Sequence, residues 1–253
     1  MVNNRLKKIF ADGKAAIGTF VVTNAPELVE ILGITGFDFI VIDSEHGPTG
    51  PESSLNLIRA AELRGITPIV RIPNSMESTI LHTLDIGAHG IQVPQVNDPE
   101  TARDIVFRSM YHPAGRRGLA FGRANDYGQM DMDKYCEHEN SQVMIIAHCE
   151  NITGLENLDA ICQIPEIDVI FLGPYDMSQS MGITGQVTHP RIQEAAQKVV
   201  AAAKKYGKVA GIYAGSGAIA KERAAQGFQY ITVGMDTVLF AGKCKQEVEA
   251  FKG

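Results

Sequence analysis

Three ionisable side chains follow a predicted buried strand in the stretch from Phe39 to Pro48. The stretch begins as an unbroken apolar run, which is typical of a strand that is buried on both faces. It then ends in Asp43, Glu45 and His46, and a Gly-Pro pair stops the strand. An acid/base cluster at the carboxyl end of a buried strand is how parallel α/β folds present catalytic groups. A charged loop after a core strand is the alternative interpretation, and it weakens because the pattern recurs at other strand ends.

Two further carboxylates, Glu150 and Asp176, follow two strands that we predict to be neighbours. Neighbouring strands lie about 4.8 Å apart, so side chains that project from their ends can share one ion. Two buried carboxylates without a cation would repel each other, and one of them would stay protonated. Because both ligands are hard oxygens, the expected cation is Mg²⁺ or Mn²⁺ with several waters. The alternative is that each carboxylate caps the helix that follows it.

Arg71 and His46 provide the other groups that this chemistry needs. Arg71 terminates an apolar strand, where a guanidinium suits an oxyanion or a carboxylate, and a salt bridge to a neighbouring acid is the alternative. His46 has an ordinary pKa of about 6.5, which suits a general base at neutral pH, and a structural histidine is the alternative. A metal, a base and an arginine together define a reaction class. That class is the formation and stabilisation of an enolate beside a carbonyl group that the metal binds.

The hydrophobic pattern alternates between strands and helices along the whole chain. Strands are predicted at 17–22, 37–43, 67–71, 90–94, 143–150, 168–172, 209–213 and 230–234. Helices are predicted at 3–11, 25–32, 53–64, 77–85, 98–108, 130–140, 153–163, 190–206, 216–226 and 238–251. Eight strand-helix alternations predict one (β/α)8 TIM barrel domain over residues 1–253, with an additional helix at the N-terminus. A doubly wound sheet is the alternative; it explains the count of eight less well, and no GxGxxG follows the first strand.

One segment interrupts this rhythm. Residues 111–129 are rich in Gly, Arg and Asn and form a long excursion between a predicted helix and the next one. Long excursions in compact domains are usually functional, and a solvated surface loop is the alternative.

The composition narrows the class of protein. The chain has 253 residues, enough for a large core, and a formal net charge of -6, which argues against nucleic acid or an anionic membrane as a partner. The first eleven residues are charged and lack an apolar core, so we expect no signal peptide, and no apolar run approaches the length of a membrane span. The four cysteines are scattered without a CxxC pair, which favours reduced thiols in the cytoplasm.

The ordered series of motifs resembles the metal-dependent (class II) pyruvate aldolases of the HpcH/HpaI family. That family includes 4-hydroxy-2-oxoheptanedioate aldolase and 2-dehydro-3-deoxyglucarate aldolase. The resemblance covers essentially the whole chain, and its series of motifs is more specific than any one of them. The matching segments are 36–48, 68–71, 84–87, 93–96, 111–118, 149–150, 171–178, 211–212 and 233–236.

The resemblance implies a metal site and an assembly. It implies that Glu150 and Asp176 bind a divalent cation (Mg²⁺, Mn²⁺ or Co²⁺), which pyruvate would chelate through its carboxylate and keto oxygens. Arg71 would stabilise the enolate oxygen, and His46, oriented by Asp85, would move the proton, through a water on the metal. It also implies a C-terminal helix that is swapped between subunits, with dimers assembling into a hexamer.

The resemblance assigns further residues to the site. Asp43 and Glu45 would lie near the waters of the metal or at the subunit interface. The backbone of Gly173, Pro174 and Tyr175 would hold the pyruvate carboxylate.

Three positions depart from the relatives. His148 replaces the usual Gln and is expected to contact pyruvate or the metal, with an effect on metal preference. Tyr175 replaces a small residue, and Tyr213 stands where relatives place an aliphatic residue near the aldehyde. These departures leave the enolate half of the reaction intact and leave the identity of the aldehyde open.

The leading hypothesis for function is therefore a reversible retro-aldol lyase that cleaves a 4-hydroxy-2-oxo acid to pyruvate and an aldehyde. The alternative on the same site is decarboxylation of oxaloacetate or a related 2-oxo acid, which yields the same enolate. A phosphate-binding barrel, with the anion near residues 214–217 and 233–236, is disfavoured because Asp236 would repel the anion. A barrel without activity is disfavoured because the set of His46, Arg71, Glu150 and Asp176 is intact.

Overall fold

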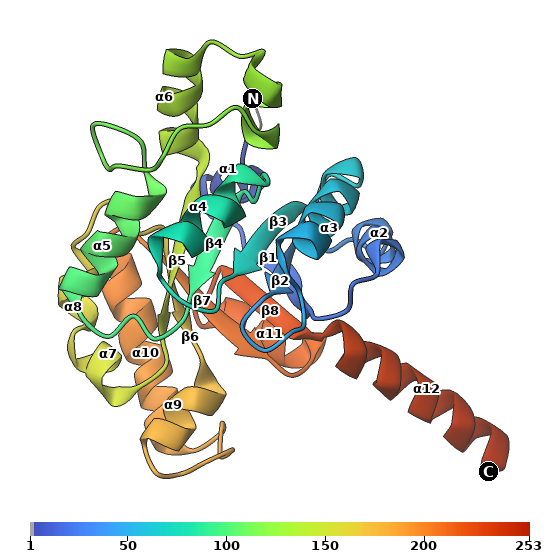
Figure 1. Cartoon of the computed structure of the whole chain (residues 1–253). Coiled ribbons are helices and arrows are strands. Elements are labelled where there is room, and N and C mark those ends of the chain that lie inside the picture. Colours follow the sequence, from blue (N-terminus) through green and yellow to red (C-terminus); the bar gives the residue numbers. More distant parts are fainter. Residues whose placement is uncertain (1–2) are drawn as a thin grey trace.

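Eight parallel strands close into a barrel in the order in which they occur along the chain. The computed structural model describes residues 3–253 (Figure 1). The strands are β1 (Ala16–Val21), β2 (Phe39–Asp43), β3 (Thr67–Arg71), β4 (Gly90–Val93), β5 (Met144–Cys149), β6 (Val169–Leu172), β7 (Val209–Ala214) and β8 (Tyr230–Met235). The prediction of a (β/α)8 barrel is confirmed. Met1 and Val2, the start of the segment that we expected to lack a leader peptide, lie outside the described residues.

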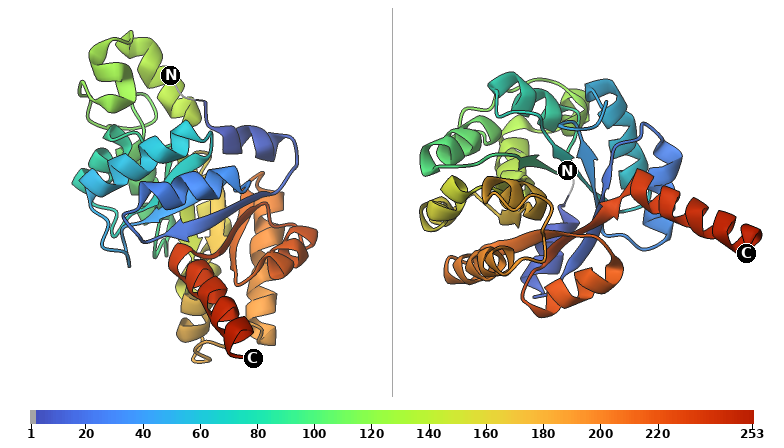
Figure 2. Two further views of the ribbon diagram at one scale, coloured as in Figure 1. Left: turned by 90° about the vertical axis from the view of Figure 1, so that its right-hand side faces the viewer. Right: turned by 90° about the horizontal axis from the view of Figure 1, so that it is seen from below.

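Helices surround this barrel as an outer layer, and Figure 2 shows the arrangement along the barrel axis. They are α1 (Arg5–Ala11), α2 (Pro26–Ile34), α3 (Pro51–Leu63), α4 (Glu77–Asp85), α5 (Pro99–Ser109), α6 (Met132–Gln142), α7 (Ile152–Glu156), α8 (Leu158–Cys162), α9 (Pro174–Ser180), α10 (Pro190–Lys205), α11 (Gly217–Ala225) and α12 (Asp236–Lys252). The expected N-terminal helix is α1, and its fully buried Leu6 packs into the inner core of the barrel. The side chain of Asn4 accepts a hydrogen bond from the backbone N–H of Leu6 and so caps α1.

The structure differs from the sequence predictions at three places. The helix expected at 153–163 is two short helices, α7 and α8, that meet at Asn157. The segment after β6, read as a loop, begins with α9, so that Asp176 lies in the first turn of a helix. The excursion at 111–129 contains a 3₁₀ segment, η1 (Arg123–Gly128), which is irregular because Asp126 and Tyr127 have positive φ angles.

Alternate residues of each strand point into the barrel, because the side chains of a strand have a period of two. The inward set forms one core cluster with α1, and the outward set packs against the helices in a second cluster. In β2 the inward residues are Phe39, Val41 and, at the end of the strand, Asp43. By the same alternation β3 ends on an inward Arg71, and β5 points His148 inward. The predicted polar residues therefore enter the barrel at its carboxyl end.

The last helix, α12, extends away from the barrel, as Figure 1 and the right-hand view of Figure 2 show. Most of its residues are exposed, including the apolar side chains of Val238, Leu239, Phe240, Val248 and Phe251. Within residues 3–253 no helix combines the length and the apolar character that crossing a membrane requires.

Gly18 on β1 leaves room for a stack of two aromatic rings inside the barrel, toward the amino ends of its strands. A Cβ atom at this position would lie 2.3 Å from the ring of Phe39, so no larger residue fits without displacing that ring. The space allows Phe39 to stack on Tyr230, with 4.3 Å between the ring centroids. The stack therefore depends on the absence of a side chain at position 18.

We predict that Gly18→Ala destabilises the barrel by about 1–3 kcal/mol, because overpacking a closed core forces neighbouring side chains out of their rotamers. Urea unfolding followed by circular dichroism measures the change. Gly217→Ala is the matched control, since a Cβ atom on Gly217 would meet open space. Equal stability of Gly18→Ala and Gly217→Ala would show that Phe39 is not confined in this way.

Candidate active site

A cavity of about 200 Å³ opens at the carboxyl end of the barrel and brings most of the predicted site residues together. The residues that line it come from six strands and from the segments that follow two of them. The lining residues are Phe20, Arg71, His148, Glu150, Phe171, Gly173, Pro174, Tyr175, Asp176, Tyr213 and Met235. Six β-strand ends thus contribute to one concave, polar and aromatic site, which is the usual place for chemistry in a barrel of this kind.

Arg71 is held rigidly at the wall of this cavity. Its strand pairs with β2 so that Arg71 lies directly opposite Asp43. Nε and Nη2 of Arg71 donate to the two carboxylate oxygens of Asp43 at 2.9 and 2.6 Å, and Nη1 lies 3.2 Å from Glu45. The guanidinium also lies 4.7 Å from the centre of the Phe20 ring. Arg71 therefore forms a salt bridge, as the alternative interpretation of the sequence had it, and still faces the cavity.

The two acids around Arg71 differ in their protonation. Burial raises the pKa of the Asp43 carboxyl, but the hydrogen bonds and charge of Arg71, with the N–H groups of His46 and Glu45, outweigh burial and lower it. Burial also raises the pKa of Glu45, and the charge of Glu150 adds to this effect, so that the pKa stays above its usual value despite Arg71. Asp43 is thus a firmly ionised partner of Arg71, whereas Glu45 is more readily protonated.

His46 and Asp85 are not brought together within one chain. His46 is exposed at the rim near Glu45, and its ring forms no hydrogen bond with any described residue. Asp85 is the last residue of α4 and accepts a hydrogen bond from Arg117 at 2.9 Å. A helix that follows a barrel strand runs back toward the amino ends of the strands, so Asp85 lies at the end of the barrel opposite to His46. The expected contact between them requires a second copy of the chain.

Glu150 and Asp176 flank the backbone of Gly173. A Cβ atom on Gly173 would lie 2.9 Å from Oε2 of Glu150 and 3.9 Å from Oδ2 of Asp176, so a glycine keeps open the space between the carboxylates. Glu150 is only 4% exposed, and its Oε1 accepts a hydrogen bond from the backbone N–H of Gln95 at 2.7 Å. Asp176 is exposed to the cavity mouth from the first turn of α9. The interpretation of Glu150 as a cap is not seen, because Asn151 caps α7 instead.

This pair of carboxylates fits a hard divalent cation. Burial raises the pKa of Glu150, but His148, the N–H of Gln95 and the charge of Arg71 outweigh burial and hold the pKa below its usual value. An ionised carboxylate in a buried place is therefore available as a ligand. Within residues 3–253 no cluster of three or more His, Cys, Asp or Glu side chains is arranged for metal binding. A cation between Glu150 and Asp176 would draw its other ligands from water or substrate, as Mg²⁺ commonly does.

Several residues around the site were not singled out from the sequence. Gln95 has a φ of 53°, an uncommon left-handed conformation for a residue other than glycine, and this conformation aims its N–H at Glu150. Gln92, fully buried on β4, bonds to His148. Phe20 and Met235 line the cavity from β1 and β8. In the sequence, only their positions near strand ends could have indicated that these residues belong to the site. Apolar residues occupy such positions too, so this signal does not single them out.

Aromatic rings form the outer wall of the cavity. Tyr175 and Tyr213 meet edge to face with 5.8 Å between their centroids, and Phe20 lies 6.4 Å from Tyr213. Tyr175 is 53% exposed, whereas Tyr213 is half-buried, and burial raises the pKa of its hydroxyl. The two tyrosines that departed from the resemblance therefore lie side by side at the entrance.

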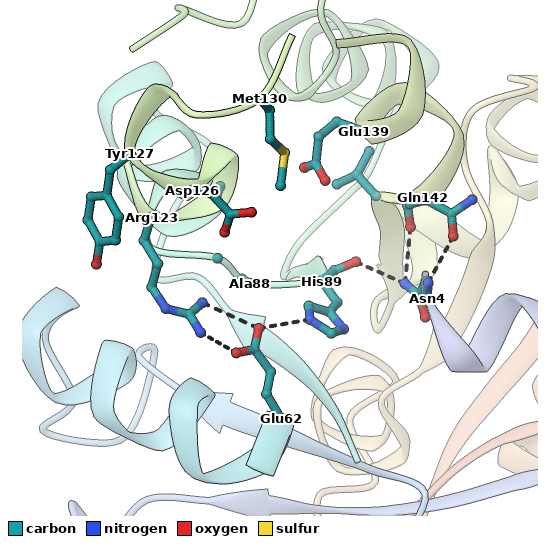
Figure 3. A pocket seen from close by; sticks show the side chains of 13 residues that line it. Asn4, Glu62, Ala88, His89, Arg123, Asp126, Tyr127, Met130, Glu139 and Gln142 are labelled. Atoms are coloured by element: carbon teal, nitrogen blue, oxygen red, sulfur yellow. Dashed lines mark hydrogen bonds and ion pairs between the residues drawn. The ribbon is translucent and has the colours of Figure 1, made fainter. Parts of the chain in front are cut away.

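A second cavity, of about 270 Å³, lies at the amino end of the barrel beneath η1 and α6 (Figure 3). Three of its ionisable side chains, Glu62, His89 and Arg123, interact with one another. Glu62 accepts hydrogen bonds from Arg123 and contacts Nε2 of His89 at 3.2 Å, and burial of Glu62 is outweighed by these partners, which lower its pKa. This network of Glu62, His89 and Arg123 attaches the excursion to the barrel.

The excursion is therefore placed away from the carboxyl-end cavity of its own chain. The side chain of Arg117 is completely buried, pairs with Asp85 at 2.9 Å and with Glu139 at 3.6 Å, and lies 4.7 Å from the ring centre of Tyr111. The arginine-rich motif thus has a structural role within the chain. The exposed tip of the excursion carries the apolar side chains of Leu119, Phe121 and Tyr127.

We predict that the pair of Asp43 and Arg71 makes the protein sensitive to acid. The pKa of Asp43 is lowered by folding, so the pair stabilises the protein above the usual value of 3.8 and loses this effect as the pH falls below it. Asp43→Asn should cost about 3–5 kcal/mol at pH 7, because it leaves a buried guanidinium without its main partner. The difference from the wild type should shrink as the pH falls below 3.8, toward the lowered pKa of the folded state.

Urea unfolding at several pH values measures this difference. Asp12→Asn is the control, because Asp12 is exposed at the end of α1. A constant difference between wild type and Asp43→Asn over the whole pH range would contradict an ionised, folding-dependent Asp43.

Comparisons with known proteins show the family of this chain and its fold. A model of the family described as HpcH/HpaI aldolase/citrate lyase matches residues 16–242. The chain is 34% identical to a hydroxypyruvate/pyruvate aldolase of Roseobacter denitrificans, over 98% of this chain and 97% of the relative. It is 31% identical to a 2-keto-3-deoxy-L-rhamnonate aldolase of Klebsiella pneumoniae, over 100% and 94%. The crystal structure of an HpcH/HpaI aldolase from Desulfitobacterium hafniense superposes with a TM-score of 0.93 at 29% identity, over 98% of this chain and 96% of that one.

Proposed function

The chain belongs to the HpcH/HpaI aldolase/citrate lyase family and is an enzyme of the aldehyde-lyase class, and on this basis we propose that it reversibly cleaves a 4-hydroxy-2-oxo acid to pyruvate and an aldehyde, with a divalent cation as cofactor. One observation carries the proposal. The carboxylates of Glu150 and Asp176 flank Gly173 in the same cavity that Arg71 faces. The cation is Mg²⁺, Mn²⁺ or Co²⁺, and when bound it would polarise the 2-oxo group of the substrate.

Arg71 stabilises the negative charge that develops as the carbon-carbon bond breaks. Cleavage leaves an electron pair on the pyruvate carbon, and this charge is delocalised onto the oxygen of an enolate. The guanidinium faces the cavity and is held by Asp43 and Glu45, so it needs no rearrangement at the moment of reaction. A preorganised positive group in a half-enclosed cavity lowers the energy of such an oxyanion more than water does.

The backbone after β6 supports binding of the pyruvate carboxylate. Of the three residues expected there, Pro174 has no N–H and the N–H of Gly173 donates to Cys149. The N–H of Tyr175, at the start of α9, is the remaining donor of this set and lies beside the cavity. We therefore assign the role of carboxylate donor to Tyr175, with Gly173 as the residue that leaves space.

His46 moves the proton in this proposal. Its ring is free and exposed at the rim of the cavity, where it can take a proton from the 4-hydroxyl group or return one to the enolate through a water molecule. If Asp85 orients this ring, the Asp85 in question belongs to a second copy, since both residues lie at opposite ends of one barrel. The site would then be complete only in an oligomer.

The assembly that we propose is a hexamer formed as a trimer of dimers. Support comes from the exposed apolar side chains of α12, a helix that leaves its own barrel and would be swapped onto a partner.

The four cysteines are all free thiols, which is consistent with a reducing cytoplasm. The negative net charge favours small-molecule substrates over nucleic acid or membrane surfaces.

The aromatic wall faces the aldehyde half of the substrate in this proposal. Tyr175 and Tyr213 lie toward the cavity mouth, and the buried ring of Phe20 continues this wall inward, beside Arg71. Decarboxylation of oxaloacetate is the second candidate, because the same groups would stabilise the same enolate and the aldehyde wall would not be needed. Parallel assays with oxaloacetate and with a 4-hydroxy-2-oxo acid separate the main reaction from the side reaction.

We predict that removal of divalent cations with a chelator abolishes cleavage, and that Mn²⁺, Mg²⁺ or Co²⁺ restores it. Pyruvate release, coupled to lactate dehydrogenase, measures the rate. Asp176→Asn should reduce kcat/KM by at least about 100-fold, because it removes one of the two charged ligands. Asp159→Asn is the control, since Asp159 is an exposed acid paired with Lys205 on the outer surface. Full activity of metal-free enzyme would refute the proposal.

A further inference from the structure

A chain of hydrogen bonds crosses the interior of the barrel and ends on Glu150. The hydroxyl of Tyr230 on β8 lies 2.8 Å from Oε1 of Gln92 on β4. Nε2 of Gln92 lies 2.7 Å from Nε2 of His148 on β5, and Nδ1 of His148 lies 2.7 Å from Oε2 of Glu150. All four side chains are at least 96% buried. The chain thus connects the core of the barrel to one of the two carboxylates at its mouth.

The donors and acceptors in this chain have one consistent direction. The buried hydroxyl of Tyr230 has a single proton, and its partner in the structure is Oε1 of Gln92, which accepts it. The amide nitrogen of Gln92 must then donate, so Nε2 of His148 accepts. The reverse orientation of the amide would leave the Tyr230 proton without an acceptor in the core, which is costly. The ring proton of His148 therefore lies on Nδ1 and is donated to Glu150.

Both ring nitrogens of His148 are occupied by this arrangement. Neither has a lone pair or a proton free for a metal ion or for pyruvate, although the ring lines the cavity. The ring is also fixed in its plane by Phe171, which stacks on it with 4.8 Å between the centroids. At the far end of the chain, Tyr230 is held by its stack with Phe39 at 4.3 Å. The chain is therefore anchored by aromatic packing at two points.

This chain of hydrogen bonds determines how the Glu150 carboxylate is oriented. Oε2 accepts the His148 proton, and Oε1 accepts the N–H of Gln95, each at 2.7 Å. One donor on each oxygen defines the rotation of the carboxylate and leaves further lone pairs directed at the space beside Gly173. A carboxylate that is already oriented loses less conformational freedom when it binds a cation.

We propose that His148 is a positioning residue, which Tyr230 and Gln92 hold in a single tautomer so that it presets Glu150 for the divalent cation. This inference rests on the proposed function, because it concerns the same cation. It differs from the expectation that His148 contacts pyruvate or the metal directly. The position needs a donor toward Glu150 and an acceptor toward Gln92, and the imidazole of His148 supplies both.

The position of the ring proton is tested by neutron diffraction from crystals of metal-free wild-type enzyme. We expect deuterium on Nδ1 of His148 and none on Nε2. Deuterium on Nε2 would overturn the inference, because His148 would then donate to Gln92 and would not be held in the single tautomer that Gln92 and Tyr230 impose. This test does not depend on activity or on metal binding.

Affinity for Mn²⁺, measured by isothermal titration calorimetry on the purified full-length protein, tests the effect on the site. His148→Leu should weaken binding by about 10–100-fold, as loss of a partner of a metal ligand commonly does. His148→Asn should retain most of the affinity, because its amide nitrogen can take the place of Nδ1. Tyr230→Phe, which removes one hydroxyl remote from the cavity, should weaken binding in the same direction and by less.

Thr232→Val is the matched control for these variants. Thr232 is fully buried on the same strand as Tyr230, and its hydroxyl has no hydrogen-bond partner among the described residues. Thermal unfolding confirms that each variant is folded; if His148→Leu is not, His148→Asn and Tyr230→Phe carry the comparison. Affinities of His148→Leu and Tyr230→Phe within twofold of Thr232→Val would overturn the inference. Wild-type enzyme that binds no Mn²⁺ would instead refute the proposed metal site itself.

Discussion

An imbalance of charge at the mouth of the barrel dominates the chemistry of this protein. Asp43, Glu45, Glu150 and Asp176 lie around the cavity, and Arg71 is the one lysine or arginine among its described lining residues. Asp43 and Glu45 already share that guanidinium, so Glu150 and Asp176 have no equivalent partner. Negative charges that are held close together in a partly buried place attract a cation. A divalent cation at the proposed metal site would neutralise the excess negative charge at the mouth of the barrel.

The barrel geometry produces this imbalance from ordinary sequence rules. Inward residues recur at every second position, and the parallel register sets Asp43 beside Arg71. Glu150 and Asp176 follow β5 and β6, which are neighbours, and Gly173 lets their carboxylates face a common space. At the amino end of the barrel the charged side chains are arranged differently. There Glu62, His89 and Arg123 neutralise one another, so that end stabilises the fold and is not expected to carry chemistry (Figure 3).

The sequence predicted the eight strands and the polar residues at their carboxyl ends, because both follow from local patterns. Both Asp43 and Arg71 were selected from strand ends alone; Arg71 lines the cavity, and Asp43 is the buried partner that holds it. Local patterns do not predict contacts that depend on how helices and strands are arranged in three dimensions. The sequence could not show that Asp85 ends on the opposite side of the barrel from His46, since this follows from the path of α4. Gln92 and Tyr230 escaped notice because a polar side chain within an apolar strand has no periodic signature, and its partner lies 138 residues away.

The most direct test of the metal site is a crystal structure of the enzyme soaked with Mn²⁺ and recorded at an X-ray wavelength where manganese scatters anomalously. The account predicts one strong anomalous peak at the carboxyl end of the barrel, within about 2.0–2.3 Å of a carboxylate oxygen of both Glu150 and Asp176. A peak that contacts only one of them, or that lies elsewhere in the molecule, would contradict the account.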